Sequence, residues 1–278
     1  MYAISLAAVC ALVWGASDFC GGKATQRWNP LSVTVLSQIL GLPMIALLVA
    51  VIPGTPRWGD LLLGVAAGVA GLWGIVLLYR GLSQGAMAVV APITAVTGAL
   101  VPLAGGLLLG ERPGPAALIG AFCAVAAIGL VSLSPREGHI RITANTVLLA
   151  LLSGACFGTF FIVLGFAEDG AGMWPMVGVR ASSIPVGILL AVRAGASLRM
   201  RGGTTGALTV AAGVGDTLAN GFYLLAVQHG AMSVIAPVAA LYPASTVLLA
   251  LFVEKERIRA LQLAGLGLAA AALVLTAS

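Results

Sequence analysis

The chain has 278 residues, of which 60% are hydrophobic and only 8% are charged, and its formal net charge is +5. Because soluble domains carry roughly 25% charged residues, this composition excludes a water-soluble fold. A mean hydropathy of +1.09 predicts that lipid covers most of the exterior. The 14 Lys and Arg residues are scattered between apolar runs without a continuous basic stripe, so no nucleic-acid partner is expected.

Ten apolar runs, each long enough to cross a lipid bilayer at about 20 residues, follow one another along the chain. The first five cover residues 3–21, 31–52, 60–80, 86–109 and 114–133, and the second five cover 145–167, 173–193, 206–228, 231–253 and 259–277. A single helix from Thr217 to Val253 would overshoot the hydrocarbon, since a helix rises about 1.5 Å per residue. The sequence therefore predicts a tight turn near 228–230 and an all-α membrane protein with ten transmembrane helices.

The second half of the chain repeats the first. Residues Gly85–Pro92 return as Gly230–Pro237, with six identities in eight at an offset of 145 residues. The same offset relates Glu111 to Glu256 without a gap. The repeat divides the chain into a first five-helix repeat, a linker and a second five-helix repeat, at 1–135, 136–144 and 145–278.

Five spans in each repeat determine how the two copies lie in the membrane. An odd number of crossings inverts the second copy relative to the first, so Glu111 and Glu256 are predicted on opposite faces. Alternating-access carriers are built from inverted repeats of this kind, with the substrate site near the midplane. The repeat therefore favours transport.

Three motifs resemble those of the EamA-type transporters of the drug/metabolite transporter superfamily. They are Trp14-Gly15-Ala16-Ser17-Asp18-Phe19 in the first run, and Ala91-Pro92 with Gly110-Glu111-Arg112-Pro113 around the fourth. The resemblance covers nearly the whole chain. It implies two inverted five-helix halves, a central cavity, and export or import of small metabolites such as amino acids, sugars or amphipathic compounds.

Ionisable residues inside the apolar runs are the leading site candidates, because each costs about 2.5–3.5 kcal/mol at the bilayer centre. Asp216 lies near the middle of the eighth run and shares a helix face with Asn220 and Tyr223. Arg180 lies about two turns into the seventh run and needs an anion, either Asp216 or a carboxylate of the substrate. Snorkelling of Arg180 to the nearer interface is the structural alternative.

Asp18 lies near the end of the first run, where it either faces the cavity or pairs with Lys23 at the interface. Trp14 is one turn earlier on the same helix face and would supply an aromatic wall for a solute.

Weaker candidates are polar residues that suit an interfacial anchor as well as a cavity lining, namely Gln38, Tyr79, Arg80 and Tyr242. Pro92 and Pro237 are equivalent residues near the starts of the fourth and ninth runs. Each proline either sits in the first helical turn or frees backbone carbonyls for a ligand, and we favour the first reading.

Motifs of membrane enzymes and of ATP-driven pumps are missing from the sequence, which contains no GxSxG, HExxH, paired Asp or Walker A motif. The four cysteines show no metal-ligand spacing. No catalytic residue, metal site or cofactor is expected.

Orientation can be predicted from the positive charges of the loops. Loops after odd-numbered spans carry eleven Lys or Arg residues, whereas loops after even-numbered spans carry only Arg57 and Arg112. The positive-inside rule then places the first set in the cytoplasm and both termini outside, although the resemblance implies both termini inside. We expect a multi-pass protein of a bacterial plasma membrane.

Together these features predict a secondary active transporter that exports a small metabolite, amino acid-like or otherwise polar or amphipathic, by alternating access. Protons are the expected coupling ion, through Asp18 or Asp216. An uptake permease for a sugar or similar solute is the alternative within the same class. A channel or scaffold without coupled transport is the alternative from another class.

Overall fold

The computed structural model describes residues 1–83, 87–132, 143–245, 248–249 and 260–277, apart from the side chains of residues 79–83, 87–89, 91–92, 132, 169 and 277. The helices in chain order are α1 (Tyr2–Thr25), α2 (Pro30–Leu40), α3 (Leu42–Val51), α4 (Trp58–Ser83), α5 (Met87–Leu108), α6 (Pro115–Ser132), α7 (Ala144–Gly165), the 3-10 turn η1 (Asp169–Ala171), α8 (Trp174–Arg193), α9 (Gly203–Val227), α10 (Met232–Ala239) and α12 (Ala260–Ala277). The described residues contain no strand.

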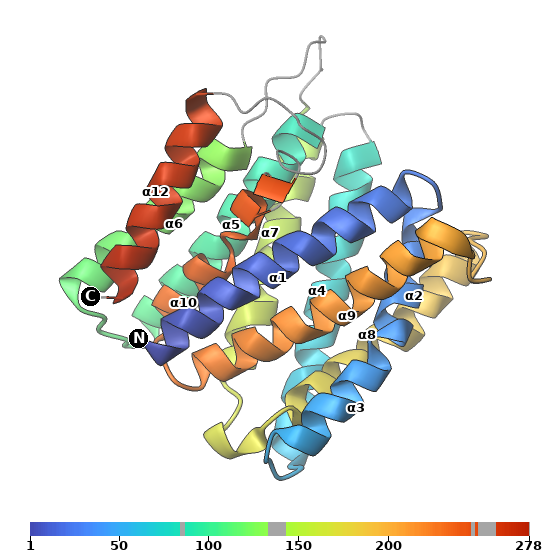
Figure 1. Cartoon of the computed structure of the whole chain (residues 1–278), viewed down its shortest axis with the longest axis horizontal. Coiled ribbons are helices and arrows are strands. Elements are labelled where there is room, and N and C mark those ends of the chain that lie inside the picture. Colours follow the sequence, from blue (N-terminus) through green and yellow to red (C-terminus); the bar gives the residue numbers. More distant parts are fainter. Residues whose placement is uncertain (84–86, 133–142, 246–247, 250–259, 278) are drawn as a thin grey trace.

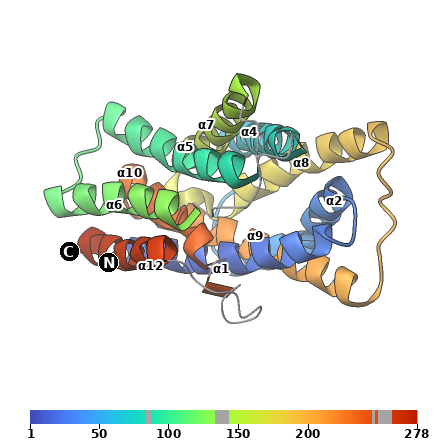
Figure 2. The same ribbon diagram turned by 90° about the horizontal axis from the view of Figure 1, so that it is seen from above.

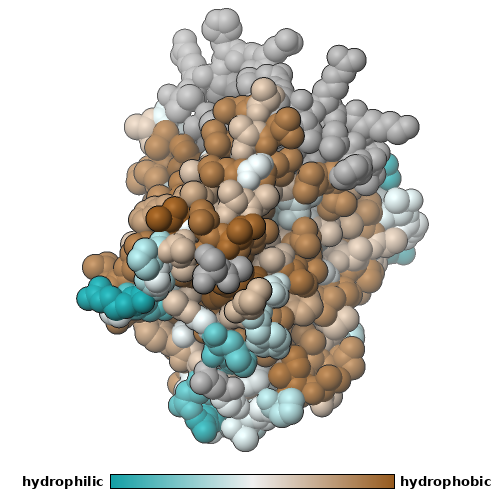
Figure 3. Space-filling view, turned by 60° about the vertical axis from the view of Figure 1, so that its left-hand side comes forward, coloured by the Kyte–Doolittle hydropathy of each residue, from teal (hydrophilic) through white to brown (hydrophobic). Residues whose placement is uncertain are grey.

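Six described segments are long and apolar enough to cross a membrane: Tyr2–Thr25, Pro30–Val51, Trp58–Leu78, Ala144–Gly165, Trp174–Arg193 and Gly203–Val227. The four shorter apolar helices Ile93–Leu108, Pro115–Val131, Met232–Ser245 and Ala260–Thr276 lie where the sequence predicts the other spans. The expected all-helical membrane architecture is confirmed. In Figure 3, hydrophobic residues cover most of the middle of the visible surface, as a lipid-facing exterior requires.

Prolines interrupt two of the runs that the sequence analysis treated as single helices. The run 31–52 consists of α2 and α3, which meet at Gly41. Pro43 has no amide hydrogen to donate to the carbonyl four residues earlier, which explains the break. Likewise α10 ends at Ala239, four residues before Pro243, and helical backbone resumes at Tyr242.

Chain ends and loops gather on two opposite faces. One face, which we name the terminal face, contains the N-terminus and the loops 52–57, 109–114, 166–173 and 228–231. On this face the Thr55 amide donates to the Gly170 carbonyl (3.0 Å), and the centroid of the Tyr2 ring lies 5.5 Å from that of the His229 ring. The loops 26–29 and 194–202 meet on the other face, named the basic face, where Arg201 donates to the Arg27 carbonyl (2.8 Å). Figure 1 shows both chain ends near each other.

Helices at equivalent positions of the two repeats pack in a reciprocal pattern. Helix α1 lies along α9 as α7 lies along α4, and α6 and α12 pack against each other. Figure 2 shows α4, α5 and α7 on one side of the bundle and α1, α9 and α12 on the other. The backbones approach closely at glycines: Gly68 of α4 lies against the Val179 carbonyl of α8, and Gly213 of α9 lies against the Ser37 carbonyl of α2.

Close packing of α4 on α8 gives a testable prediction at Gly178. A Cβ atom there would collide with the Leu61 carbonyl oxygen, and this backbone atom cannot rotate away. We expect Gly178→Ala to cost about 1–3 kcal/mol of overpacking strain and to lower the melting temperature of the purified protein in detergent. The control is Gly22→Ala, where nothing lies within 4 Å of the new Cβ and Ala is the better helix former. Equal melting temperatures for the two variants would contradict this packing.

Candidate functional site

An ion pair between a buried arginine and a partly exposed aspartate lies between α8 and α9. The Arg180 Nη2 atom donates to Asp216 Oδ2 at 2.5 Å and to Thr217 Oγ1 at 3.5 Å. The Arg180 side chain is only 7% exposed, whereas that of Asp216 is 38% exposed. Of the two anions that the sequence analysis allowed for Arg180, the structure therefore supplies Asp216, and Arg180 does not snorkel to an interface.

Two further side chains donate hydrogen bonds to the other oxygen of the Asp216 carboxylate. Asn220 Nδ2 donates to Asp216 Oδ1 at 3.0 Å and to the Asp216 backbone carbonyl at 2.7 Å. The Trp14 indole N–H donates to the same Oδ1 atom at 3.3 Å. Because Trp14 belongs to the first repeat and the other groups to the second, this cluster joins the two halves of the chain.

Aromatic rings surround the Trp14 indole. Its ring centroid lies 5.6 Å from that of Phe161, 6.4 Å from that of Tyr223 and 6.1 Å from that of Tyr242. The Tyr223 hydroxyl donates to the Phe161 carbonyl (3.1 Å), so it points away from Asp216 although the sequence places both on one polar face. The rings belong to an apolar core that continues to Ala3 near the terminal face.

Asp18 lies on α1, on the same helix as Trp14 of this cluster. It follows Trp14 by one helical turn on α1, and its side chain is exposed on the surface of the structure. No residue in the described ranges hydrogen-bonds to the Asp18 carboxylate or forms an ion pair with it. Lys23, its expected interfacial partner, lies with its ammonium 5.9 Å from the Phe19 ring centroid.

Gln38 and Ser183 form a buried hydrogen bond between α2 and α8. The Ser183 hydroxyl donates to Gln38 Oε1 at 2.6 Å. The two residues are 145 positions apart, the offset of the repeat, so equivalent positions of the two halves contact each other. Gln38 is thus in the interior and not an interfacial anchor.

For three of the remaining candidates the structure describes only the backbone. Tyr79 and Arg80 belong to α4 and Pro92 to α5, but their side chains lie outside the described residues. Pro237 is the sixth residue of α10, counted from Met232. It therefore lies beyond the first turn, and our favoured reading of a first-turn proline is wrong, although the helix begins within one residue of the predicted run 231–253.

A contact near the terminal face links the two repeats a second time. Glu111 Oε1 accepts the amide hydrogen of Met232 (2.8 Å), and Oε2 accepts that of Ser233 (2.7 Å). These amides begin α10, whose N-cap residue Ala231 offers no capping side chain. A carboxylate at this place satisfies two donors and faces the positive end of the helix dipole. Sequence analysis used Glu111 as a marker of the repeat and as part of a family motif, and did not name it as a site candidate.

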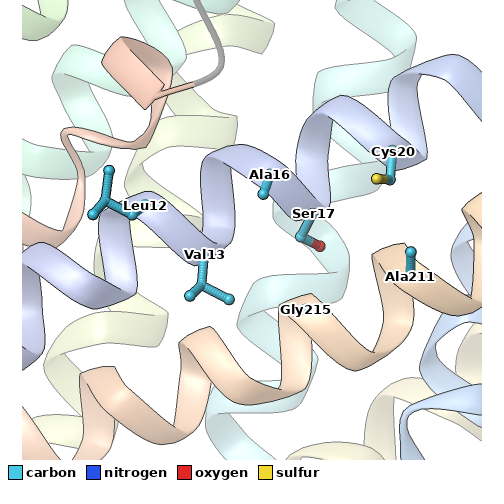
Figure 4. A pocket seen from close by; sticks show the side chains of 7 residues that line it. All are labelled: Leu12, Val13, Ala16, Ser17, Cys20, Ala211 and Gly215. Carbon is cyan, nitrogen blue, oxygen red and sulfur yellow. The ribbon is translucent and has the colours of Figure 1, made fainter. Parts of the chain in front are cut away.

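An apolar groove of about 300 Å³ between α1 and α9 contributes no charge to the site. Figure 4 shows its lining side chains, Leu12, Val13, Ala16, Ser17, Cys20 and Ala211, together with Gly215. The groove is shallow and open, and Trp14 and Asp216 lie on other faces of the same two helices. The polar cluster around Asp216 is therefore the better candidate for solute recognition.

Comparisons with known proteins agree with the fold. One solved crystal structure superposes with a TM-score of 0.80 at 15% sequence identity, over 99% of this chain and 98% of the other. No curated protein sequence matches the chain. The sequence model of the EamA-like transporter family matches twice, at residues 1–133 and 144–278, so that both halves of the chain are covered. The chain therefore belongs to the EamA-like transporter family, within the drug/metabolite transporter superfamily.

Proposed function

We propose that this transporter is a secondary carrier that moves a small polar or amphipathic metabolite by alternating access, with export as its net direction. The observation that carries the proposal is the Arg180–Asp216 ion pair, which lies inside the bundle and is joined by Trp14 of the other repeat. Charges at this depth are costly and mark solute or ion pathways in membrane proteins.

The arrangement around the pair supports access from one side at a time. The core from Ala3 through Tyr223 to Trp14 fills the bundle between the site and the terminal face, whereas the Asp18 side chain next to the site is exposed. An exchange of conformations between inverted repeats would open the filled side and close the other. A channel would need both sides open at once.

The proposal includes ten membrane crossings as two inverted five-helix repeats, with the basic face in the cytoplasm of a bacterial cell. The described loops of that face carry Arg27, Arg199 and Arg201, as the positive-inside rule requires. Epitope tags at both termini should then be cleaved by protease added to intact spheroplasts, because the termini lie on the opposite face. Cleavage only after lysis would place the termini in the cytoplasm.

A flux screen of purified protein in proteoliposomes tests the carrier proposal. We expect saturable, stereoselective movement of one component of a metabolite pool, changed by an imposed proton gradient if Asp18 or Asp216 couples protons. Asp216→Asn should lose this flux, because the amide cannot hold Arg180 as an ion pair. Glu168→Gln, which removes an exposed carboxylate from the terminal face, is the matched control. Flux that rises linearly with concentration would favour a pore, and net accumulation inside cells would favour an uptake permease.

A further inference from the structure

The apolar groove between α1 and α9 lies on a different face of these helices from the charged site (Figure 4). Its lining residues Leu12 and Ala16 are exposed, and exposed apolar side chains of a membrane-spanning helix are in contact with lipid. The Ser17 hydroxyl, which also lines the groove, donates to the Ala212 carbonyl (2.7 Å). An apolar cavity of about 150 Å³ takes up a benzene molecule, so a groove of about 300 Å³ accommodates a stretch of acyl chain.

The groove points along both helices toward the basic face. Helix α1 ends and α9 begins on that face, where the loops 26–29 and 194–202 meet. Residues 16, 20 and 23 are spaced by four and three positions, which places them on one side of α1. The groove residues Ala16 and Cys20 are therefore in line with Lys23 in the last turn of the helix. Arg27 follows four residues after Lys23.

Arginine side chains gather at this end of the groove. Four of them are exposed, namely Arg27, Arg193, Arg199 and Arg201. Arg201 is fixed in position, because its Nη1 atom donates to the Arg27 carbonyl at 2.8 Å and its Cζ atom lies 6.0 Å from the centroid of the Trp28 ring. That hydrogen bond uses one of the five N–H groups of the guanidinium. Among the described residues none forms an ion pair with these arginines, so an external anion finds unused charged donors.

The distance from the groove to the arginines fits the dimensions of a phospholipid. Cys20 is the groove residue of α1 nearest to the basic face, and it precedes Arg27 by seven residues, or about 10 Å along the helix axis. A bilayer of about 40–45 Å around a hydrocarbon core of about 30 Å has a polar layer of roughly 5–8 Å on each side. A guanidinium in this position therefore meets the phosphate of a lipid whose acyl chain passes Cys20.

The groove and the arginines together favour a lipid over a soluble anion. A soluble anion would use the arginines and leave the groove unexplained. A neutral lipid would fill the groove without using the charges. Basic residues beside the ends of membrane helices attract the headgroups of anionic lipids. The combination of a cationic end and an apolar channel is the complement of one anionic phospholipid.

We propose that one anionic phospholipid binds here, with its phosphate at Arg27 and Arg201 and one acyl chain in the groove between α1 and α9. The inference concerns lipid binding and does not depend on the proposed carrier function. Trp14 of α1 binds Asp216 of α9 on other faces of the same helices. A lipid that contacts both helices therefore stabilises the packing that forms the candidate site.

Native mass spectrometry of the purified full chain in detergent tests the inference with two lipids that share the same acyl chains. Dioleoylphosphatidylglycerol is anionic, and dioleoylphosphatidylcholine has no net charge. We expect the first phosphatidylglycerol molecule to bind about tenfold or more tightly than the first phosphatidylcholine, and Arg27→Gln with Arg201→Gln to remove most of this preference. The matched control is Arg57→Gln with Arg112→Gln, which removes two exposed arginines from the terminal face.

A variant that fills the groove tests the position of the acyl chain. Ala16→Phe places a ring in the groove and should weaken the binding of phosphatidylglycerol by about tenfold. Ala126→Phe adds the same ring to an exposed position of α6 and should leave the affinity unchanged.

Cys20 reports occupancy of the groove without any change to its lining. Cys10 is fully buried, so replacement of Cys123 and Cys156 by Ser leaves Cys20 as the accessible thiol. Phosphatidylglycerol at about ten times its dissociation constant should slow the maleimide labelling of Cys20 by about tenfold. Phosphatidylcholine at the same concentration should protect it much less.

Three outcomes would overturn the inference: equal affinity for the two lipids, an undiminished preference for phosphatidylglycerol in the Arg27 and Arg201 double variant, or labelling of Cys20 that phosphatidylglycerol does not slow. Displacement of the lipid by inorganic phosphate, but not by sodium chloride of equal ionic strength, would indicate a site for a soluble anion and also overturn it. Flux in proteoliposomes tests the carrier proposal alone, so the two proposals fail separately.

Discussion

Replacing Arg180 with Gln is expected to abolish saturable flux and to lower the melting temperature. The Gln amide does not supply the positive charge that holds Asp216, and the carboxylate is left between Asn220 and Trp14. Removal of one partner from a buried pair costs about 3–5 kcal/mol, and the partial exposure of Asp216 reduces the expected loss to about 1–3 kcal/mol. Thermal unfolding in detergent and flux in proteoliposomes measure the two effects.

A double variant separates stability from function. Arg180→Met with Asp216→Leu removes both charges together, so no unpaired charge remains and we expect most of the lost stability to return. Flux should stay at the level of empty liposomes, because the cluster has lost its charges. Recovery of flux together with stability would show that the ion pair only supports the fold.

Glu111→Gln is expected to open the terminal face more often. The neutral amide loses the charge that favours the α10 N-terminus and accepts amide hydrogens through one oxygen instead of two. Helix caps contribute about 0.5–2 kcal/mol, so the population of conformations open at this face should rise by about tenfold.

Cys10 is a native reporter of that opening, since its side chain is fully buried in the core beside Tyr223. With Cys20, Cys123 and Cys156 replaced by Ser, the maleimide labelling rate of Cys10 measures access from the terminal face. We expect faster labelling in Glu111→Gln than in Glu168→Gln, which lies on the same face and loses the same charge. Identical rates in the two variants would show that Glu111 does not hold this side closed.

Much of the fold follows from local properties of the sequence. Apolar runs predict helices, and the repeat agrees with the reciprocal packing of α1 on α9 and α7 on α4, which the sequence analysis did not predict. The interruptions at Gly41 and near Pro243 were not predicted, although Pro43 and Pro243 lie beside them. Hydropathy does not depend on whether a residue has a backbone amide hydrogen to donate, and proline has none. The start of α10 was predicted within one residue, but Pro237 lies in the second turn of that helix, so the first-turn reading of this proline was wrong.

The sequence predicted the charged residues of the site but not the contacts that these residues make. Asp216 and Arg180 stand out because charges are costly in apolar runs, and their pairing was one of two alternatives. The bond from Trp14 to Asp216 depends on how α1 rotates against α9, which no local pattern fixes. Phe161 carries no polar group, so its place beside Trp14 has no signal in the sequence.

Counterflow in proteoliposomes tests the central claim most directly. Vesicles loaded with the unlabelled transported solute are diluted into a trace of the labelled solute without any ion gradient. A carrier whose Asp216 site opens to one side at a time exchanges solute, so the label should transiently accumulate above its equilibrium level in wild-type protein and not in Asp216→Asn. Label that rises only to equilibrium in both proteins would contradict alternating access at this site.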